Sequence, residues 1–356
     1  MTQLISFDGS VDRRQAPLVP HRHAFPSAMM SLGVLMGLPY ETSLIQAHDR
    51  TWRMDHDHNL HMGLSGEAFH FKFDTAEYFH CSMPEGTAPI RDCFSAIGLP
   101  CEIHSMKGIQ GLDGEFTDES EVKKLVVENL CEGFPVLLLC RKKVERVILA
   151  IGYEQDGEVL IAWVFSTGDD IPNKCFSPSE CQYLSAWSKD IGAVVLVKGE
   201  PSRPKTEVLM DTCRRALTRN ERILREHRNP CEEPEGSYYD RWIKGLRDNR
   251  FWTTNPTGFP YIYPDIFDLA ERRIYGAEFL KSVGVILGTD KLLPAVAAGN
   301  DIHRLMWTVH SMINETEKGN TALSDWSVRE KIVKLLNQCR SLDKRIAECI
   351  ANTLQE

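Results

Sequence analysis

The sequence of 356 residues lacks the features that identify membrane, secreted or disulfide-rich proteins. It has no run of about 18 apolar residues, so no membrane-spanning helix is expected. Its first residues lack the basic start and the apolar stretch of a signal peptide. No two of its eleven cysteines have Cys-x-x-Cys spacing, and a disulfide scaffold is not expected in a chain of this size without a secretion signal. These absences together predict a cytoplasmic protein.

Two further absences concern partners and cofactors. The formal net charge is −9, and a nucleic-acid partner is not expected because phosphate binding needs a basic surface. No glycine-rich loop of the kind that cradles phosphates is present, so no nucleotide cofactor is predicted. The 42% of hydrophobic residues is enough for a core, and the length fits one large or two ordinary domains.

The stretch from residue 21 to residue 38 is the most informative part that is present. It predicts a helix over residues 25–37. Pro26 suits a first helical turn, where its missing N–H is not needed, and Gly37 follows the apolar run as a helix-ending glycine.

A sheet is expected between residues 134 and 198. Four apolar runs predict strands, and Gly157 lies in a hairpin turn between the second and the third of them. A helix is predicted over residues 118–132, with Asp118 as its N-cap and Glu121 three residues later, as in a capping box. The alternation of Phe69, Phe71 and Phe73 predicts a further half-buried strand. The four predicted strands of the sheet cover residues 134–140, 144–153, 158–165 and 192–198.

The periodicity of the hydrophobic residues changes at the proline-bearing link 199–204, from strand-like runs to a helical pattern. Beyond this link nearly all of the chain has helical periodicity, and the last predicted helix, over residues 322–354, repeats apolar residues as one stripe. We therefore predict two domains, over residues 1–200 and 201–356.

Three motifs follow one another along the chain in an informative order. They are the helix at 26–38, the turn Met-Gly-Leu-Ser-Gly-Glu-Ala-Phe at 62–69 and the hairpin at 147–163. In this order they resemble the N-terminal region of the butirosin biosynthesis protein H family, which has the papain-like, C39-like cysteine peptidase fold. The segment 236–242 resembles the C-terminal region of the same family. The resemblance implies an α+β papain-like domain with an antiparallel sheet, followed by an all-α domain. It also implies acyl transfer from a carrier-linked substrate.

The active-site residues of that fold are missing at the positions that the resemblance implies. The nucleophilic cysteine would lie at Ala24, the imidazole at Arg146, and the orienting Asp or Asn at Ala162 or Trp163. The glutamine that helps to hold the oxyanion has no counterpart near Leu18. Thiol chemistry at this helix is therefore not expected, because alanine has no nucleophilic atom.

Other residues near this helix offer alternatives. Ser27, in the first helical turn, and His23 are candidate catalytic residues, although Ser27 equally suits a residue that satisfies helix N-terminal donors. Arg146 could bind an anionic group, and with Ala24, Ser27 and Trp163 it would line a ligand cleft. The alternative for Arg146 is a salt bridge to a neighbouring carboxylate.

The histidine-rich run at residues 55–61 offers a weak candidate for a metal site. His56 and His58 would share one side of a strand, and His61 could join them from a turn. The spacing matches no standard metalloenzyme signature, and a solvated polar loop is the other interpretation. The run leads into the turn that contains Ser65, which we expect to border the cleft.

These observations support three hypotheses on function. The first is a non-proteolytic papain-like protein of specialised metabolism that binds a small acyl, amino-acid or peptide-like ligand in a degenerate cleft. The second is an acyltransferase or amide-forming enzyme, and the third is a metal-dependent enzyme using the histidines at 56, 58 and 61.

Overall fold

The structure is a computed structural model that describes most of the chain, and it divides into two compact units. The first unit comprises Met1–Glu41 and Phe79–Thr212, and the second comprises Thr42–Tyr78 and Cys213–Glu356. This partition differs from two consecutive domains, because residues 42–78 group with the helical C-terminal part. The described residues are 3–4, 23–39, 42–47, 50–71, 86–106, 111–140, 146–166, 181–226, 237–254, 263–314 and 319–355.

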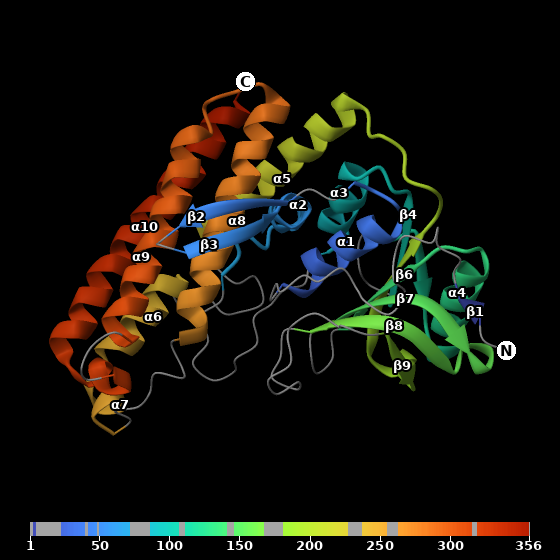
Figure 1. The fold of residues 1–356 in the computed structure, drawn as a ribbon, viewed down its shortest axis with the longest axis horizontal. Helices are drawn as coiled ribbons and strands as arrows, with labels where there is room; N and C mark the ends of the chain where they lie inside the picture. The colour runs from blue at the N-terminus through green and yellow to red at the C-terminus, as the bar shows by residue number, and fades with distance from the viewer. Residues whose placement is uncertain are drawn as a thin grey trace. The chain divides into compact units, whose positions relative to one another are not determined.

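The first unit is built on one open sheet (Figure 1) with strand order β5-β4-β10-β6-β7-β8-β9, and β1 pairs with β7 outside this path. All pairings are antiparallel except the parallel pairing of β4 with β5. The strands are β1 (Gln3–Leu4), β4 (Cys101–Met106), β5 (Gly114–Phe116), β6 (Val136–Cys140), β7 (Arg146–Glu154), β8 (Val159–Ser166), β9 (Gln182–Ser185) and β10 (Ile191–Val197).

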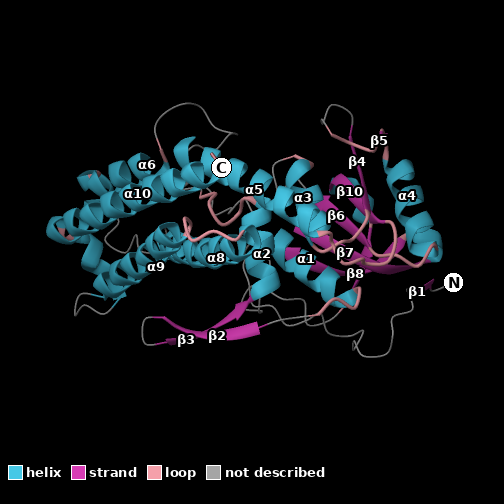
Figure 2. Cartoon of the chain, turned by 90° about the horizontal axis from the view of Figure 1, so that it is seen from above, coloured by secondary structure: helices cyan, strands magenta, loops and turns pink. Residues whose placement is uncertain are grey.

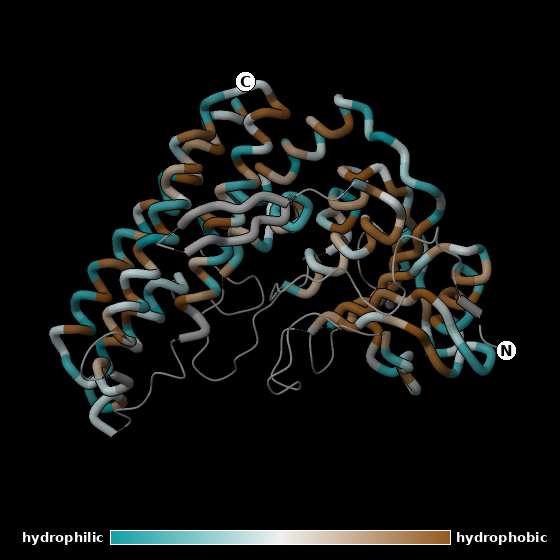
Figure 3. Tube along the Cα trace, viewed as in Figure 1, coloured by the Kyte–Doolittle hydropathy of each residue, from teal (hydrophilic) through white to brown (hydrophobic). Residues whose placement is uncertain are grey.

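The central strands are apolar on both faces because both faces are covered. β6 is buried along its whole length, and Figure 3 shows the strands of this sheet as the most hydrophobic part of the unit. One face packs against α4 (Glu119–Cys131) through Val122, Val126 and Leu130. The opposite face carries α1 (Ala24–Leu35), which contacts β7 and β8, as Figure 2 shows. The helix α3 (Ala88–Ala96) lies beside α1.

Two of three local signals in this unit act as the sequence predicted, and the third, the capping box at Glu121, does so only in part. Asp118 caps α4 by accepting hydrogen bonds from the backbone N–H groups of Ser120 and Glu121. The side chain of Glu121 accepts from the N–H of Thr117 instead of from that of Asp118, so the capping box is incomplete. Gly157 has a φ of 92° in the turn η1 (Gln155–Gly157), which joins β7 to β8. A second short turn of helix, η2 (Trp187–Asp190), precedes β10.

The second unit is mainly helical, and every element that the structure describes beyond residue 205 is a helix. Its N-terminal part is the hairpin β2 (Thr42–Ala47) and β3 (Arg50–Asp55), followed by α2 (His56–Ser65). The long helix α9 packs against both α8 and α10, and Figure 3 shows hydrophobic and hydrophilic residues alternating along these helices. The C-terminal helices are α5 (Thr206–Glu226), which begins in the first unit and belongs to the second from Cys213 on, α6 (Tyr238–Arg247), α7 (Asn249–Thr254), α8 (Tyr263–Leu287), α9 (Leu293–Asn314), η4 (Gly319–Ser324) and α10 (Trp326–Leu354).

Two sequence-based assignments in this unit are wrong. His56 and His58 lie on the helix α2 and not on a strand. Residues 69–71 do not form a strand, since Phe69 and His70 donate their backbone N–H groups to Gly66 within a turn. Phe69 and Phe71 are both buried, and Phe71 packs on Trp242 with ring centroids 5.8 Å apart. Phe73 lies outside the described residues.

Among the described residues, no helix combines the length and the hydropathy that a bilayer crossing requires.

Candidate functional site

The N-terminus of α1 is the first candidate site, and it lies against the sheet of the first unit. His23 is the N-cap residue, with an extended backbone and no side-chain capping bond. The N–H of Ser27 donates to the carbonyl of His23 at 3.1 Å, which closes the first turn. No acidic side chain is present in this turn, so the positive end of the helix dipole is not offset there by a carboxylate.

The residues at this helix end are buried. His23 and Ser27 are each 1% exposed, and Ala24 is 2% exposed. Ala24, at which the family resemblance predicts the nucleophile, is the first residue of the helix. A methyl group at this position leaves no nucleophile.

Three buried polar atoms on this side of the sheet have no hydrogen-bond partner among the described residues. They are Ser27 Oγ, Ser31 Oγ and Trp163 Nε1. Trp163 lies on β8 between Ala162 and Val164, both of which point to the α4 face. Because side chains alternate along a strand, the Trp163 indole points to the face that carries α1. Each buried polar group without a partner costs about 1–3 kcal/mol, so a polar group or an ordered water that reached these atoms would be stabilising.

The candidate nucleophile and base do not form a pair in this structure. Ser27 Oγ makes no hydrogen bond with any described residue, and that excludes one with the His23 imidazole. A serine nucleophile is normally activated through such a bond. Among the described residues, Ser27 therefore lacks the hydrogen-bonded base that would activate it.

Arg146 lies apart from these residues. It begins β7, is exposed, and shares its strand face with Ile148 and Ala150, which belong to the core under α4. The Arg146 side chain therefore points to the opposite face of the sheet from Trp163. The structure brings Ala24, Ser27 and His23 together at the helix end and does not bring Arg146 to that face.

Ser65 belongs to the second unit, where local hydrogen bonds use its side chain. Its Oγ donates to the carbonyl of Met62 at 3.3 Å and accepts from the N–H of Glu67 at 3.4 Å. Asn220 of α5 donates its amide to the carbonyl of Gly63 at 2.9 Å. The two hydrogen bonds of Ser65 and the one from Asn220 all stabilise the C-terminal end of α2.

The three histidines of the metal hypothesis lie on α2. His58 and His61 are three residues apart and share a helix face, whereas His56 lies about 200° around the helix from His58. His58 packs edge-on against Tyr275, with ring centroids 5.0 Å apart. Among the described residues, no group of three or more His, Cys, Asp or Glu side chains is arranged to hold a metal ion.

Burial of His61 makes stability depend on pH. Desolvation lowers the pKa of His61 from 6.5 to about 3. The unfolded chain therefore binds the proton more readily below pH 6.5, and the native state should lose about 1.4 kcal/mol per pH unit from there toward pH 3. We expect His61→Leu to flatten this slope in urea denaturation at pH 7.5 and 5.5, with His56→Leu as the control. Equal slopes in wild type and His61→Leu would contradict the assignment.

The most concentrated polar chemistry of the second unit was not predicted. Arg272 of α8 is buried and donates to Asp268 at 2.6 Å and to the Glu67 carboxylate at 2.9 Å. It also donates to the Glu67 carbonyl at 2.6 Å. The turn at 66–70 is thereby fixed to α8. Gly63 permits α2 to pack closely on α8, because a Cβ at this position would lie 1.9 Å from the Phe279 ring.

Arg273 forms a second buried network beside the first. It donates to Asp343 of α10 at 2.7 and 2.9 Å, to the carbonyl of Ala68 at 2.8 Å and to Tyr238 Oη at 2.9 Å. Tyr238 and Tyr239 both donate to Asp343, at 2.6 and 2.9 Å. Burial would lower the pKa of Arg273, but the Asp343 carboxylate outweighs it and holds the pKa above its ordinary value. Burial raises the pKa of Tyr238.

One sequence signal could have revealed this network. Asp343 lies four residues after Cys339 and three before Ile346, so a carboxylate interrupts the apolar stripe of the last helix. A charged residue at a stripe position requires a buried partner. The partner itself lies on another helix and could not be identified from spacing.

The fold and site together define a mixed α/β protein, with a mostly antiparallel open sheet in one unit and a mainly helical second unit. No protein-family model matches the chain, and a search of curated proteins finds no match.

Proposed function

We propose that the chain is a non-proteolytic protein of the papain-like, C39-like type that binds a small acyl, amino-acid or peptide-like ligand at the N-terminus of α1. One observation carries the proposal. The helix end that would hold a thiol has Ala24 in its place, and the buried polar atoms of Ser27 and Ser31 on α1 and of Trp163 on the sheet have no hydrogen-bond partner among the described residues. The arrangement of α1 across β7 and β8 of an antiparallel sheet supports the choice of fold type.

The chemistry of these groups indicates the kind of ligand. The Trp163 indole N–H is only a donor, and serine hydroxyls both donate and accept. Together with the positive end of the helix dipole they favour a hydrogen-bond acceptor, such as a carbonyl or carboxylate. Ser27 and Trp163 are each 1% exposed, so the ligand group that reaches them must be small.

The proposal predicts ligand-dependent stabilisation that requires these atoms. N-acetyl amino acids and dipeptides should raise the melting temperature of the full chain, since a ligand that binds only the native state stabilises it. Ser27→Ala and Trp163→Phe should each weaken binding by about tenfold, as expected for loss of one buried hydrogen bond. Differential scanning fluorimetry and calorimetric titration measure both effects.

The control is Ser95→Ala in α3, a half-buried serine on a different helix. Equal ligand affinities in Ser27→Ala, Trp163→Phe and this control would contradict the proposed site. An acyl adduct on Ser27, found by mass spectrometry after incubation with thioester acyl donors, would overturn the non-catalytic assignment in favour of an acyltransferase.

A further inference from the structure

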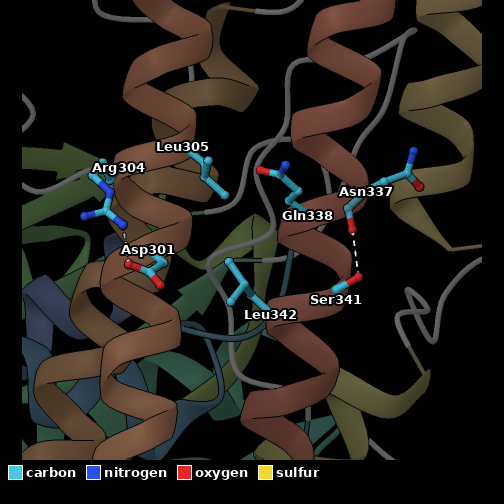
Figure 4. A pocket seen from close by; sticks show the side chains of 7 residues that line it. All are labelled: Asp301, Arg304, Leu305, Asn337, Gln338, Ser341 and Leu342. Carbon is cyan, nitrogen blue, oxygen red and sulfur yellow. Dashed lines mark hydrogen bonds and ion pairs between the residues drawn. The ribbon is translucent and has the colours of Figure 1, made fainter.

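A pocket of about 570 Å³ lies between α9 and α10 in the second unit (Figure 4). None of the residues that line it belongs to the proposed ligand site. In Figure 4 the side chains of Leu305 and Leu342 point into the space between the two helices, and the Gln338 amide lies at its edge. Arg304 and Asp301 pair with each other at 2.6 Å on the α9 side. The pocket thus has an apolar floor and a polar rim. Asn337 and Ser341 complete its lining.

A line of basic side chains extends along α10 on both sides of this pocket. Lys331, Lys334 and Arg345 are exposed, and none of them forms an ion pair with a residue that the structure describes. They stand seven and four residues before Gln338 and seven after it, so all three share the helix face that lines the pocket. Glu348, one turn beyond Arg345, is also exposed and offsets part of the charge at that end.

The length of this line of basic residues indicates whether a small anion or a partner helix binds at this surface. Fourteen residues separate Lys331 from Arg345, which is about 21 Å along a helix axis. A small anion in the pocket could not reach both ends, whereas a partner helix of about four turns could. A nucleic acid is disfavoured by the net charge of −9.

We propose that the face of α9 and α10 around this pocket binds an acidic amphipathic helix of a partner protein. One apolar anchor of that helix occupies the space between Leu305 and Leu342. Its carboxylates lie against Lys331, Lys334 and Arg345. This is the helix-in-groove mode of recognition, in which apolar anchors give affinity and the charged rim selects the partner. The surface is independent of the ligand site proposed for α1.

The test uses the full chain and labelled peptides as probes. One peptide of about 20 residues places leucine on one face and glutamate on the other, the second is a scrambled sequence of the same composition, and the third replaces glutamate by lysine. Fluorescence anisotropy should show the patterned acidic peptide binding at least about tenfold more tightly than the other two. Its affinity should fall as salt is raised from about 50 to 500 mM, because the charges on the rim are exposed.

Two variants and a matched control locate the binding. Leu305→Asp, and a triple variant with Lys331→Glu, Lys334→Glu and Arg345→Glu, should each weaken peptide binding by at least about tenfold. The control changes Lys124, Lys205 and Lys281 to Glu, three exposed lysines elsewhere, and so alters the net charge equally. Circular dichroism verifies that the variants are folded.

Three results would overturn the proposal. The first is equal peptide affinity in the two triple variants. The second is a wild-type dimer in sedimentation that Leu305→Asp dissociates, since the occupant would then be a second copy of the chain. The third is binding to anionic phosphatidylserine vesicles without binding to the patterned peptide.

Discussion

Asp343→Leu should lower the free energy of unfolding of the second unit by about 3–5 kcal/mol, the largest effect that we expect from a single substitution. Asp343 is fully buried and accepts four hydrogen bonds, two from Arg273 and one each from Tyr238 and Tyr239. Its removal leaves a buried guanidinium without a counter-charge. Urea denaturation followed by circular dichroism and by tryptophan fluorescence measures the change.

A surface pair provides the control for this substitution. Asp240 pairs with Arg340 at 2.8 Å, but the Asp240 side chain is 52% exposed. Asp240→Ala should therefore cost about 1 kcal/mol or less from the ion pair, plus up to about 1 kcal/mol because Asp240 also closes the capping box of α6. Adding Arg273→Met to Asp343→Leu should restore part of the loss, because an apolar pair can replace a buried ion pair. A loss no larger than that of Asp240→Ala, or no recovery in the double variant, would argue against the assigned role.

Arg272→Met should have the second-largest effect, about 3–5 kcal/mol, because it leaves two buried carboxylates without their cation. Glu67 and Asp268 are each about 3% exposed and both accept from this guanidinium. Arg272→Lys should recover only part of the stability, since an ammonium group cannot fork onto two carboxylates and a carbonyl at once. Denaturation of the three proteins at pH 7.5 tests this order.

The same substitution should also loosen the turn that Arg272 holds. Arg272 binds both the carboxylate and the carbonyl of Glu67, so we expect amide hydrogen exchange over residues 66–70 to be faster in Arg272→Met. Arg304→Met is the control, because the Arg304 side chain is 65% exposed in its pair with Asp301. If exchange at 66–70 is unchanged, the turn is held by its other contacts, including the hydrogen bond from Arg273 to the carbonyl of Ala68.

The buried networks give a physical account of the motif at residues 62–69. Gly63 allows close contact with Phe279, and Gly66 has a φ of 90° that favours glycine. Glu67 supplies a carboxylate to Arg272, and Phe69 packs near Gly276. Each of these residue types serves packing within the second unit. This account needs no ligand at the motif, and Ser65 is explained in the same way.

The sequence predicted the central strands β6, β7, β8 and β10 and the helices α1 and α4 for reasons that are local, whereas the strands β1, β4, β5 and β9 were not predicted. The apolar runs at 134–140 and 158–165 become β6 and β8, because a strand covered on both faces must be apolar at successive positions. Asp118 caps α4 and Gly133, with a φ of 92°, follows its end, because capping depends only on neighbouring backbone groups. The helical character beyond residue 205 followed from periodicity in the same way.

Long-range contacts account for what the sequence left undecided. Hydrophobic periodicity does not reveal that residues 42–78 group with the C-terminal helices, since this depends on contacts such as that of Arg272 with Glu67, 205 residues apart. The face to which Arg146 points was decided by the register of β7, because a shift of one residue reverses every side chain of a strand.

At the candidate site, too, local sequence signals and long-range contacts determined different features. The sequence by itself determined that residue 24 is an alanine, next to a helix predicted over residues 25–37, and so that residue 24 offers no thiol. Only the tertiary structure decided that Trp163 points to the face carrying α1 while Arg146 points away, and that Ser27 Oγ makes no bond to His23. Helix signals lie within one or two turns of the chain, whereas the surroundings of a buried side chain are set by strands and helices that are distant in sequence.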